Sequence, residues 1–264
     1  MNNKKILHSV SGAIVFLVLI GASIAQATIQ NTASTPTVVL IIDDLGNNLD
    51  LGIKAINLPG QISYAILPHT PNATTLANAA RAAHKEVLLH APMANQQHQP
   101  LGPGGLTIEM NKQDFLKTLR SALDATPHVR GVNNHMGSAL TTLPKQMKWL
   151  MEELAIRNLY FIDSRTSVET VAAKTAEHYG IPCLSRNIFL DNTPELKAIE
   201  QQFQKLLTKA SEEGIAVGIG HPYTETLAYL EQVLPTLEAQ GFKLVLASEA
   251  MLQSKKYLGP FLDF

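Results

Sequence analysis

The sequence has little cysteine and no concentration of charge. Cys183 is the only cysteine among 264 residues, so the chain cannot form an intramolecular disulfide. Charged residues make up 16% of the chain, the formal net charge is −1, and the basic residues are dispersed. Nucleic acids and anionic membrane surfaces are bound through concentrated positive charge, so neither is expected as a partner.

Several sequence motifs of known chemistry are also missing. The chain has no Cys-x-x-Cys pair, no Gly-x-Gly-x-x-Gly fingerprint and no Walker-type loop. A glycine-rich stretch at residues 102–105 lacks the strand-to-helix context that a phosphate-binding loop needs. The Gly-x-Ser-x-Gly elbow is absent too, which argues against a serine hydrolase. No repeat of 20 to 50 residues is visible, so a solenoid or propeller is not expected.

The N-terminus has the three parts of a secretory signal peptide. These are a basic start at Lys4 and Lys5, an apolar core over residues 13–20, and the small-x-small sequence Ala25-Gln26-Ala27. The apolar core is too short for an ordinary membrane span. We therefore expect residues 1–27 to be a signal peptide, and the protein to be periplasmic or extracellular without stable membrane insertion after cleavage. An uncleaved N-terminal anchor is the alternative.

The rest of the chain is long enough for one large α/β domain. Residues 28–36 are rich in Thr, Ser and Asn and are expected to form a linker before a domain at 37–264. Residues 38–42 are five consecutive apolar residues, typical of a strand buried on both faces of a parallel sheet. Further strands are expected at 62–67, 86–89, 129–132, 159–162, 181–184, 215–219 and 242–246. Helices are expected at 49–56, 72–83, 111–125, 144–157, 168–179, 194–213 and 226–240.

This alternation predicts an α/β fold with seven or eight mostly parallel strands. An open doubly wound sheet and a closed barrel both fit the order of elements. Candidate site residues follow nearly every strand, whereas a doubly wound sheet gathers its ligands mainly at one switch point. We therefore favour an irregular (β/α) barrel.

The residues at the strand ends point to metal-assisted hydrolysis. They are Asp43, Asp44, His90, His135, Asp163, Arg165, Arg186, Asp191 and His221. A carboxylate with two imidazoles is a common divalent-metal set, suited to zinc and tolerated by iron, cobalt or nickel. Two adjacent carboxylates repel each other, so a cation or a shared proton is expected beside Asp43 and Asp44. The other interpretation is that this pair only caps the next helix.

Six motifs in order resemble the divergent polysaccharide deacetylase family. They are Ile42-Asp43-Asp44-Leu45-Gly46, Leu89-His90-Ala91-Pro92-Met93, Asn133-Asn134-His135-Met136-Gly137-Ser138, Phe161-Ile162-Asp163-Ser164, Arg186-Asn187-Ile188-Phe189-Leu190-Asp191 and Gly220-His221-Pro222. The resemblance covers nearly all of the chain after the signal peptide. It implies a distorted (β/α) barrel and metal-dependent removal of N- or O-acetyl groups from polysaccharides.

The resemblance also implies a role for each candidate residue. Asp43 would be the general base, Asp44 a metal ligand, and His221 the general acid that protonates the leaving amine or alcohol. His90 and His135 would complete the site of a divalent metal, zinc in the first place. The base, the acid or the substrate would be held by Asp163, Arg165, Arg186 and Asp191.

The chain departs from the usual pattern of polysaccharide deacetylases in two places. Typical members take both metal histidines from one His-x-x-x-His segment, but Ala94 stands four residues after His90. The assignment of His135 as second histidine is therefore an inference from its place after a strand. The usual Arg-x-Pro motif is missing as well.

The leading interpretation is an exported, metal-dependent carbohydrate deacetylase that acts on peptidoglycan or another amino-sugar polymer of the envelope. The altered metal motif leaves room for an inactive barrel that binds glycans or assists envelope assembly. A third interpretation is a glycosidase that uses paired carboxylates such as Asp43 and Asp163. The sequence leaves open the polymer, the bond, the metal and the oligomeric state.

Overall fold

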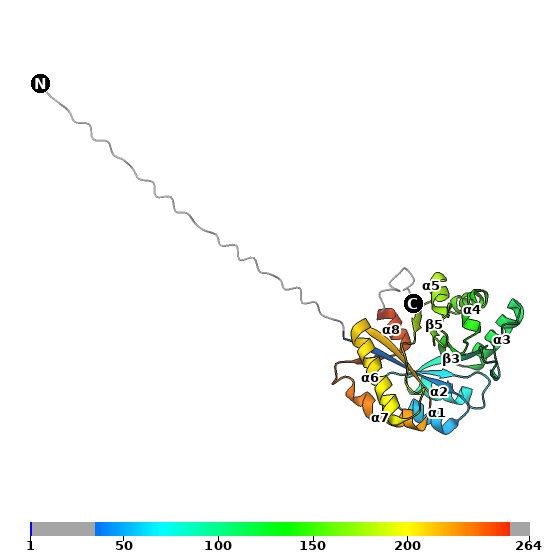
Figure 1. Cartoon of the computed structure of the whole chain (residues 1–264), viewed down its shortest axis with the longest axis horizontal. Helices are drawn as coiled ribbons and strands as arrows, with labels where there is room; N and C mark the ends of the chain where they lie inside the picture. Colours follow the sequence, from blue (N-terminus) through cyan, green and yellow to red (C-terminus); the bar gives the residue numbers. More distant parts are fainter. Residues whose placement is uncertain (2–34, 254–264) are drawn as a thin grey trace. The chain divides into compact units, whose positions relative to one another are not determined.

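The computed structural model describes Met1 and residues 35–253 (Figure 1). The expected signal peptide and most of the expected linker lie outside the described residues, as do residues 254–264. Strands and helices alternate as predicted. The strands are β1 (Thr37–Leu45), β2 (Ser63–Ile66), β3 (Glu86–Met93), β4 (Val129–Met136), β5 (Tyr160–Asp163), β6 (Cys183–Ser185), β7 (Ile188–Phe189), β8 (Ile215–Gly220) and β9 (Lys243–Val245). The helices are α1 (Leu49–Ile56), α2 (Ala73–Ala82), α3 (Lys112–Ala125), α4 (Pro144–Ile156), α5 (Ala172–His178), α6 (Leu196–Glu213), α7 (Thr224–Val233) and α8 (Ala247–Gln253), with 3₁₀ turns at Leu140–Thr142 and Leu234–Thr236.

The order of the strands shows that the sheet curls into an irregular barrel. The hydrogen-bonded order is β6-β5-β4-β3-β2-β1-β8-β7, and β9 pairs with the first half of β1. All of these pairings are parallel. The outermost strands, β6 and β7, are separated by only Arg186 and Asn187, so the two ends of the sheet must come together. The predicted fold class is therefore confirmed, with eight strands along the main path.

The two residues between β6 and β7 hold the ends of the sheet together. The backbone N–H of Arg186 donates to the carbonyl of Asp163 over 2.9 Å, beside β6. On the other side, Asn187 donates its backbone N–H to the carbonyl of Val217 over 2.9 Å. The Asn187 side-chain oxygen accepts the N–H of Val217 over 2.8 Å, in the place of a backbone carbonyl. The connection thus continues the pairing from β5 to β8.

Strand β1 is buried on both faces, as its apolar run predicts. Val38, Leu40 and Ile42 belong to a core cluster with residues of α1, α2, α6 and α7. Val39 and Ile41 belong to a different cluster, formed by inward-facing residues of the strands and by α8. Helix α8 contacts both β1 and β6, which lie far apart in the strand order. We did not predict α8, and it fills one end of the barrel interior.

Helix and strand boundaries differ from the predicted ones for local reasons. The helix expected at 226–240 ends at Val233, because Pro235 cannot donate an i→i−4 hydrogen bond, and a 3₁₀ turn follows. The helix expected at 168–179 begins only at Ala172. Strands β3 and β4 run four residues further than expected, since they pair in register as far as Met93 and Met136. Among residues 35–253, no helix has the length and apolar character needed to cross a membrane.

Candidate metal and catalytic site

The two adjacent carboxylates lie at an irregularity of β1. The pairing of β1 with β2 shifts register between Ile42 and Leu45, and Asp44 has a φ of 62°. In a regular strand, neighbouring side chains point to opposite faces, so a bulge is needed to bring both carboxylates to one place. Asp43 Oδ2 lies 3.6 Å and Asp44 Oδ1 3.1 Å from the same atom, His90 Nε2. The left-handed backbone of a non-glycine residue costs on the order of 1–3 kcal/mol, and such strain clusters at functional sites.

Three potential ligand atoms meet at this point. Asp44 Oδ1 lies 2.9 Å from His135 Nδ1 and 3.1 Å from His90 Nε2, and the two nitrogens are 3.1 Å apart. His90 is buried and His135 is half-buried. The structure therefore brings together the three residues that were predicted to bind metal, from β1, β3 and β4.

This cluster fits a divalent cation. Asp44 Oδ1 is buried, and among the described residues it has no partner in hydrogen-bonding geometry although two imidazole nitrogens face it. Zinc binds carboxylate oxygen and imidazole nitrogen at about 2.0–2.2 Å in tetrahedral sites, which places neighbouring ligand atoms roughly 3.3–3.6 Å apart. The separations in the cluster, 2.9 to 3.1 Å, lie a few tenths of an ångström below this range. Burial alone would raise the pKa of Asp44, but the two imidazoles that face it, those of His135 and His90, hold that pKa well below its usual range.

Asn133 links the cluster to the second carboxylate, and sequence reasoning gave it no role. Its Nδ2 donates to Asp43 Oδ1 over 2.8 Å, so its Oδ1 faces His90 and accepts from Nδ1–H over 2.7 Å. This bond fixes the tautomer that leaves His90 Nε2 free for a metal, as outer groups commonly do in metal sites. His90 and Asn133 are register partners in β3 and β4. The pairing of β3 with β4 places Asn133 beside His90, and this pairing cannot be read from the sequence.

Asp43 has the environment of a general base. It is 2% exposed, and its burial raises the pKa, a shift that the charges of His90 and His221 reduce without cancelling. A carboxylate with a raised pKa accepts a proton more readily near neutral pH. Its Oδ2 lies 3.6 Å from His90 Nε2, beside the metal cluster.

His221 and Asp191 form a second polar pair at the ends of β8 and β7. His221 Nδ1 lies 2.8 Å from Asp191 Oδ1, and Asp191 Oδ2 accepts the backbone N–H of His221 and the hydroxyl of Thr226. The other ring nitrogen, Nε2, lies 3.9 Å from Asp44 Oδ2 and so faces the cluster. Burial opposes the charged imidazole, but the hydrogen bond and charge of Asp191, with the charges of Asp43 and Asp44, raise the pKa of His221 to about 9.

The hydrogen bonds of Asp163 and Arg186 go to the loop after β5 rather than to the cluster. Asp163 uses one oxygen for the N–H of Arg165 (2.9 Å) and the other for the hydroxyl of Thr170 (3.0 Å). Arg186 donates to the carbonyls of Ser164 and Arg165. Of the four residues expected to orient the base, the acid or the substrate, Asp191 makes a direct contact, with His221. The contacts of Asp163, Arg165 and Arg186 lie in the loop after β5. Because both oxygens of Asp163 are engaged, a glycosidase that pairs it with Asp43 is disfavoured.

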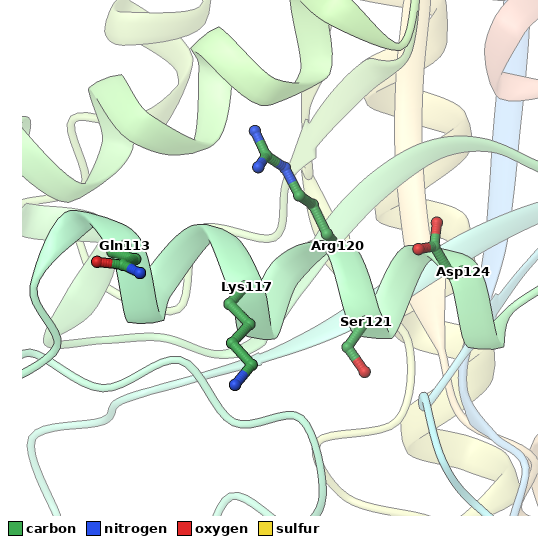
Figure 2. A pocket seen from close by; sticks show the side chains of 5 residues that line it. All are labelled: Gln113, Lys117, Arg120, Ser121 and Asp124. Carbon is green, nitrogen blue, oxygen red and sulfur yellow. The ribbon is translucent and has the colours of Figure 1, made fainter.

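A separate hollow lies along helix α3 (Figure 2). It measures about 540 Å³ and is lined by Gln113, Lys117, Arg120, Ser121 and Asp124, all from one helix. A second hollow of about 370 Å³ shares Lys117 and Ser121 with the first and reaches His69. The guanidinium of Arg120 is already paired with Glu153 at 2.8 Å. Neither hollow contains the carboxylate–imidazole cluster, so the candidate site remains at the strand ends.

Fold and site together define a (β/α) barrel with a carboxylate–imidazole cluster where its parallel strands end. Residues 40–251 match the family described as divergent polysaccharide deacetylase. The chain belongs to this family, so the resemblance inferred from its motifs is confirmed. Its relationship is therefore with hydrolases that act on acetyl amide or ester bonds of carbohydrates.

The chain is also similar to individual proteins and solved structures. The uncharacterized protein YibQ of Escherichia coli K12 is 35% identical over 198 residues, which are 75% of this chain and 62% of that protein. The chain thus spans less than two thirds of that relative's length. An uncharacterized Agrobacterium tumefaciens structure has a TM-score of 0.80 at 20% identity, over 83% of this chain and 90% of that one. The catalytic domain of the Eubacterium rectale peptidoglycan N-acetylglucosamine deacetylase has a TM-score of 0.53 at 14% identity, over 82% of this chain and 92% of that one. At these identities the two structures show the fold alone.

Proposed function

We propose that the protein is an exported, divalent-metal-dependent deacetylase that hydrolyses N- or O-acetyl groups of an envelope polysaccharide. The observation that carries this proposal is the arrangement of Asp43 and His221, a base and an acid that both face the ligand triangle of Asp44, His90 and His135. Simple binding of a glycan does not need a buried carboxylate and a charged imidazole on one cluster.

Asp44, His90 and His135 would hold the metal, with zinc as the first expectation. When bound, a divalent ion supplies polarisation of the acetyl carbonyl and a lowered pKa for water. Asn133 orients His90 through its Nδ1–H and so keeps Nε2 directed at the site. The two imidazoles hold the pKa of Asp44 below its usual range, which favours a carboxylate that binds a cation without first losing a proton.

The two protons of the hydrolysis are handled by Asp43 and His221. Asp43 takes a proton from the water that attacks the acetyl carbon, while Asn133 holds its other oxygen in place. His221 gives its Nε2 proton to the leaving nitrogen or oxygen as the carbon–nitrogen or carbon–oxygen bond breaks. The products are acetate and a free amine or hydroxyl group. Asp191 stabilises the protonated imidazole before this step and fixes its orientation.

The substrate class is an acetylated amino-sugar polymer. Family membership supports a polysaccharide. The Eubacterium rectale structure with the same fold is a peptidoglycan N-acetylglucosamine deacetylase, which makes peptidoglycan the first polymer to test. The signal peptide expected at residues 1–27 would deliver the protein to the compartment that holds this polymer.

The test measures metal content and acetate release on the same purified mature protein. Elemental analysis is expected to find near-stoichiometric zinc or a similar divalent metal. Acetate release from acetylated peptidoglycan fragments should stop with a chelator and return when metal is restored. A protein that stays free of metal after reconstitution contradicts the proposal. Glycan binding without acetate release would then favour the inactive, glycan-binding barrel.

A further inference from the structure

Three rings form a wall on the acid side of the site. The ring of His221 is stacked with Phe189 at a centroid distance of 6.2 Å and an interplanar angle of 23°. The ring of Tyr223 lies 5.5 Å from His221 at an angle of 36°. Tyr223 is 44% exposed, so part of its ring is open to a ligand. We call Phe189, His221 and Tyr223 the aromatic wall.

Contacts of Phe189 and Tyr223 with neighbouring residues fix the position of the aromatic wall. The guanidinium of Arg186 lies 3.7 Å from the centre of the Phe189 ring, and Arg186 is itself anchored by two backbone carbonyls. The backbone N–H of Tyr223 donates to the carbonyl of His221 over 2.8 Å, and Pro222 stiffens the link between them. Tyr223 directly precedes α7. Because the Tyr223 backbone is already fixed in this way, a ligand that binds to its exposed ring has a smaller conformational-entropy cost.

The chemistry of the reaction determines what lies against this wall. The acid of a deacetylase must touch the leaving atom, which is a nitrogen or oxygen of the sugar and not part of the acetyl group. Since Tyr223 is a direct neighbour of His221, the surface it offers faces the sugar. Aromatic rings pack well on groups that are apolar on one face and polar at the edge, as a pyranose ring is.

We propose that Tyr223 is the platform on which an acetylated hexosamine ring of the substrate stacks, beside His221. This inference rests on the proposed function and adds the position of the sugar. It makes Tyr223 a binding residue that acts on the sugar side and not on the acetyl side.

The experiment compares two acetyl donors and measures binding separately. The donors are N-acetylglucosamine tetrasaccharide, which has sugar rings, and 2,2,2-trifluoroethyl acetate, an ester with no ring that could stack on Tyr223. Y223A is expected to lower kcat/KM for the tetrasaccharide by about tenfold or more, mainly through KM, and to affect the ester much less. Y223F keeps the ring and should recover most of the loss. I156A removes another exposed apolar side chain, at the end of α4, and is the matched control.

The binding arm separates this inference from the proposed function. Tetrasaccharide affinity is measured by calorimetry for the parent and for Y223A, with their melting temperatures as a check of folding. If the parent binds the sugar but releases no acetate from either donor, the proposed deacetylation fails while a tenfold weaker Y223A still supports the platform. If Y223A binds as tightly as the parent, or the parent does not bind the tetrasaccharide, the platform is wrong.

Discussion

Asp43 and His90 are joined through one buried amide, that of Asn133. The amide nitrogen donates to Asp43 and the amide oxygen accepts from His90, at 2.8 and 2.7 Å, and Asn133 is fully buried. One side chain therefore sets the orientation of the proposed base and of a proposed metal ligand. It also couples the two functions, because a change at Asn133 disturbs both.

Replacing Asn133 should weaken metal binding and alter the base. In Asn133→Leu, the buried Nδ1–H of His90 loses its acceptor, and we expect roughly 10- to 100-fold weaker metal affinity, as for outer partners of metal ligands. Asn133→Asp keeps an acceptor for His90 but places a negative charge beside Asp43, which should raise the pKa of Asp43 further. Metal titration and the acidic limb of the pH–rate profile check both effects. Asn78→Ala, on the exposed face of α2, is the control; unchanged metal affinity in Asn133→Leu would contradict the linking role.

The adjacent carboxylates should respond differently to substitution. Asp44→Ala removes the oxygen shared by both histidines and is expected to lose the metal. Asp43→Asn keeps the shape and the triangle of ligands, so it should retain metal while acetate release falls by about 10²- to 10⁴-fold, the usual contribution of a general base. Elemental analysis and an acetate assay on both variants test this. If Asp44→Ala retains the metal, Asp44 is not a metal ligand. If Asp43→Asn keeps full turnover, Asp43 is not the general base.

The pH dependence of the reaction should follow from the same two groups. Hydrolysis needs Asp43 deprotonated and His221 protonated, so kcat/KM should rise with pH through the raised pKa of Asp43 and fall as pH passes about 9. Asp191→Asn removes the nearest negative charge from His221, which should lower its pKa toward an ordinary imidazole value of about 6.5. The alkaline limb should then move to lower pH while the acidic limb changes little. An unmoved alkaline limb would show that His221 is not the acid.

Sequence reasoning was successful where one strand or one helix decides the outcome. The apolar run of β1 predicted a strand buried on both faces, and the predicted helix at 49–56 agrees residue for residue with α1. Polar residues after successive strands predicted both the barrel and the meeting of Asp44, His90 and His135. The shared mouth followed from the rule that parallel strands end at the same edge of a sheet, whereas the choice of these three residues as ligands also used the family resemblance.

What the sequence could not show depends on register and on long-range packing. Asn133 is one of two consecutive asparagines, and only the pairing of β3 with β4 sets it opposite His90. Helix α8 has seven residues and little periodicity, and it forms because the barrel interior offers apolar partners. The bulge that turns Asp44 toward Asp43 likewise depends on how β1 meets β2. In each case tertiary contacts outweigh local preference.

Closure of the barrel at Asn187 gives a prediction for stability. Its side-chain oxygen accepts the N–H of Val217, and Asn187→Ala leaves this partly buried donor without its partner. Such a loss costs about 1–3 kcal/mol, which corresponds to a lower melting temperature by several degrees for a domain of this size. Asn192→Ala, at an exposed position five residues further on, is the matched control and should change stability by less than about 0.5 kcal/mol. Thermal unfolding of both variants decides the point: equal melting temperatures would show that the seam between β6 and β8 is held by the backbone alone.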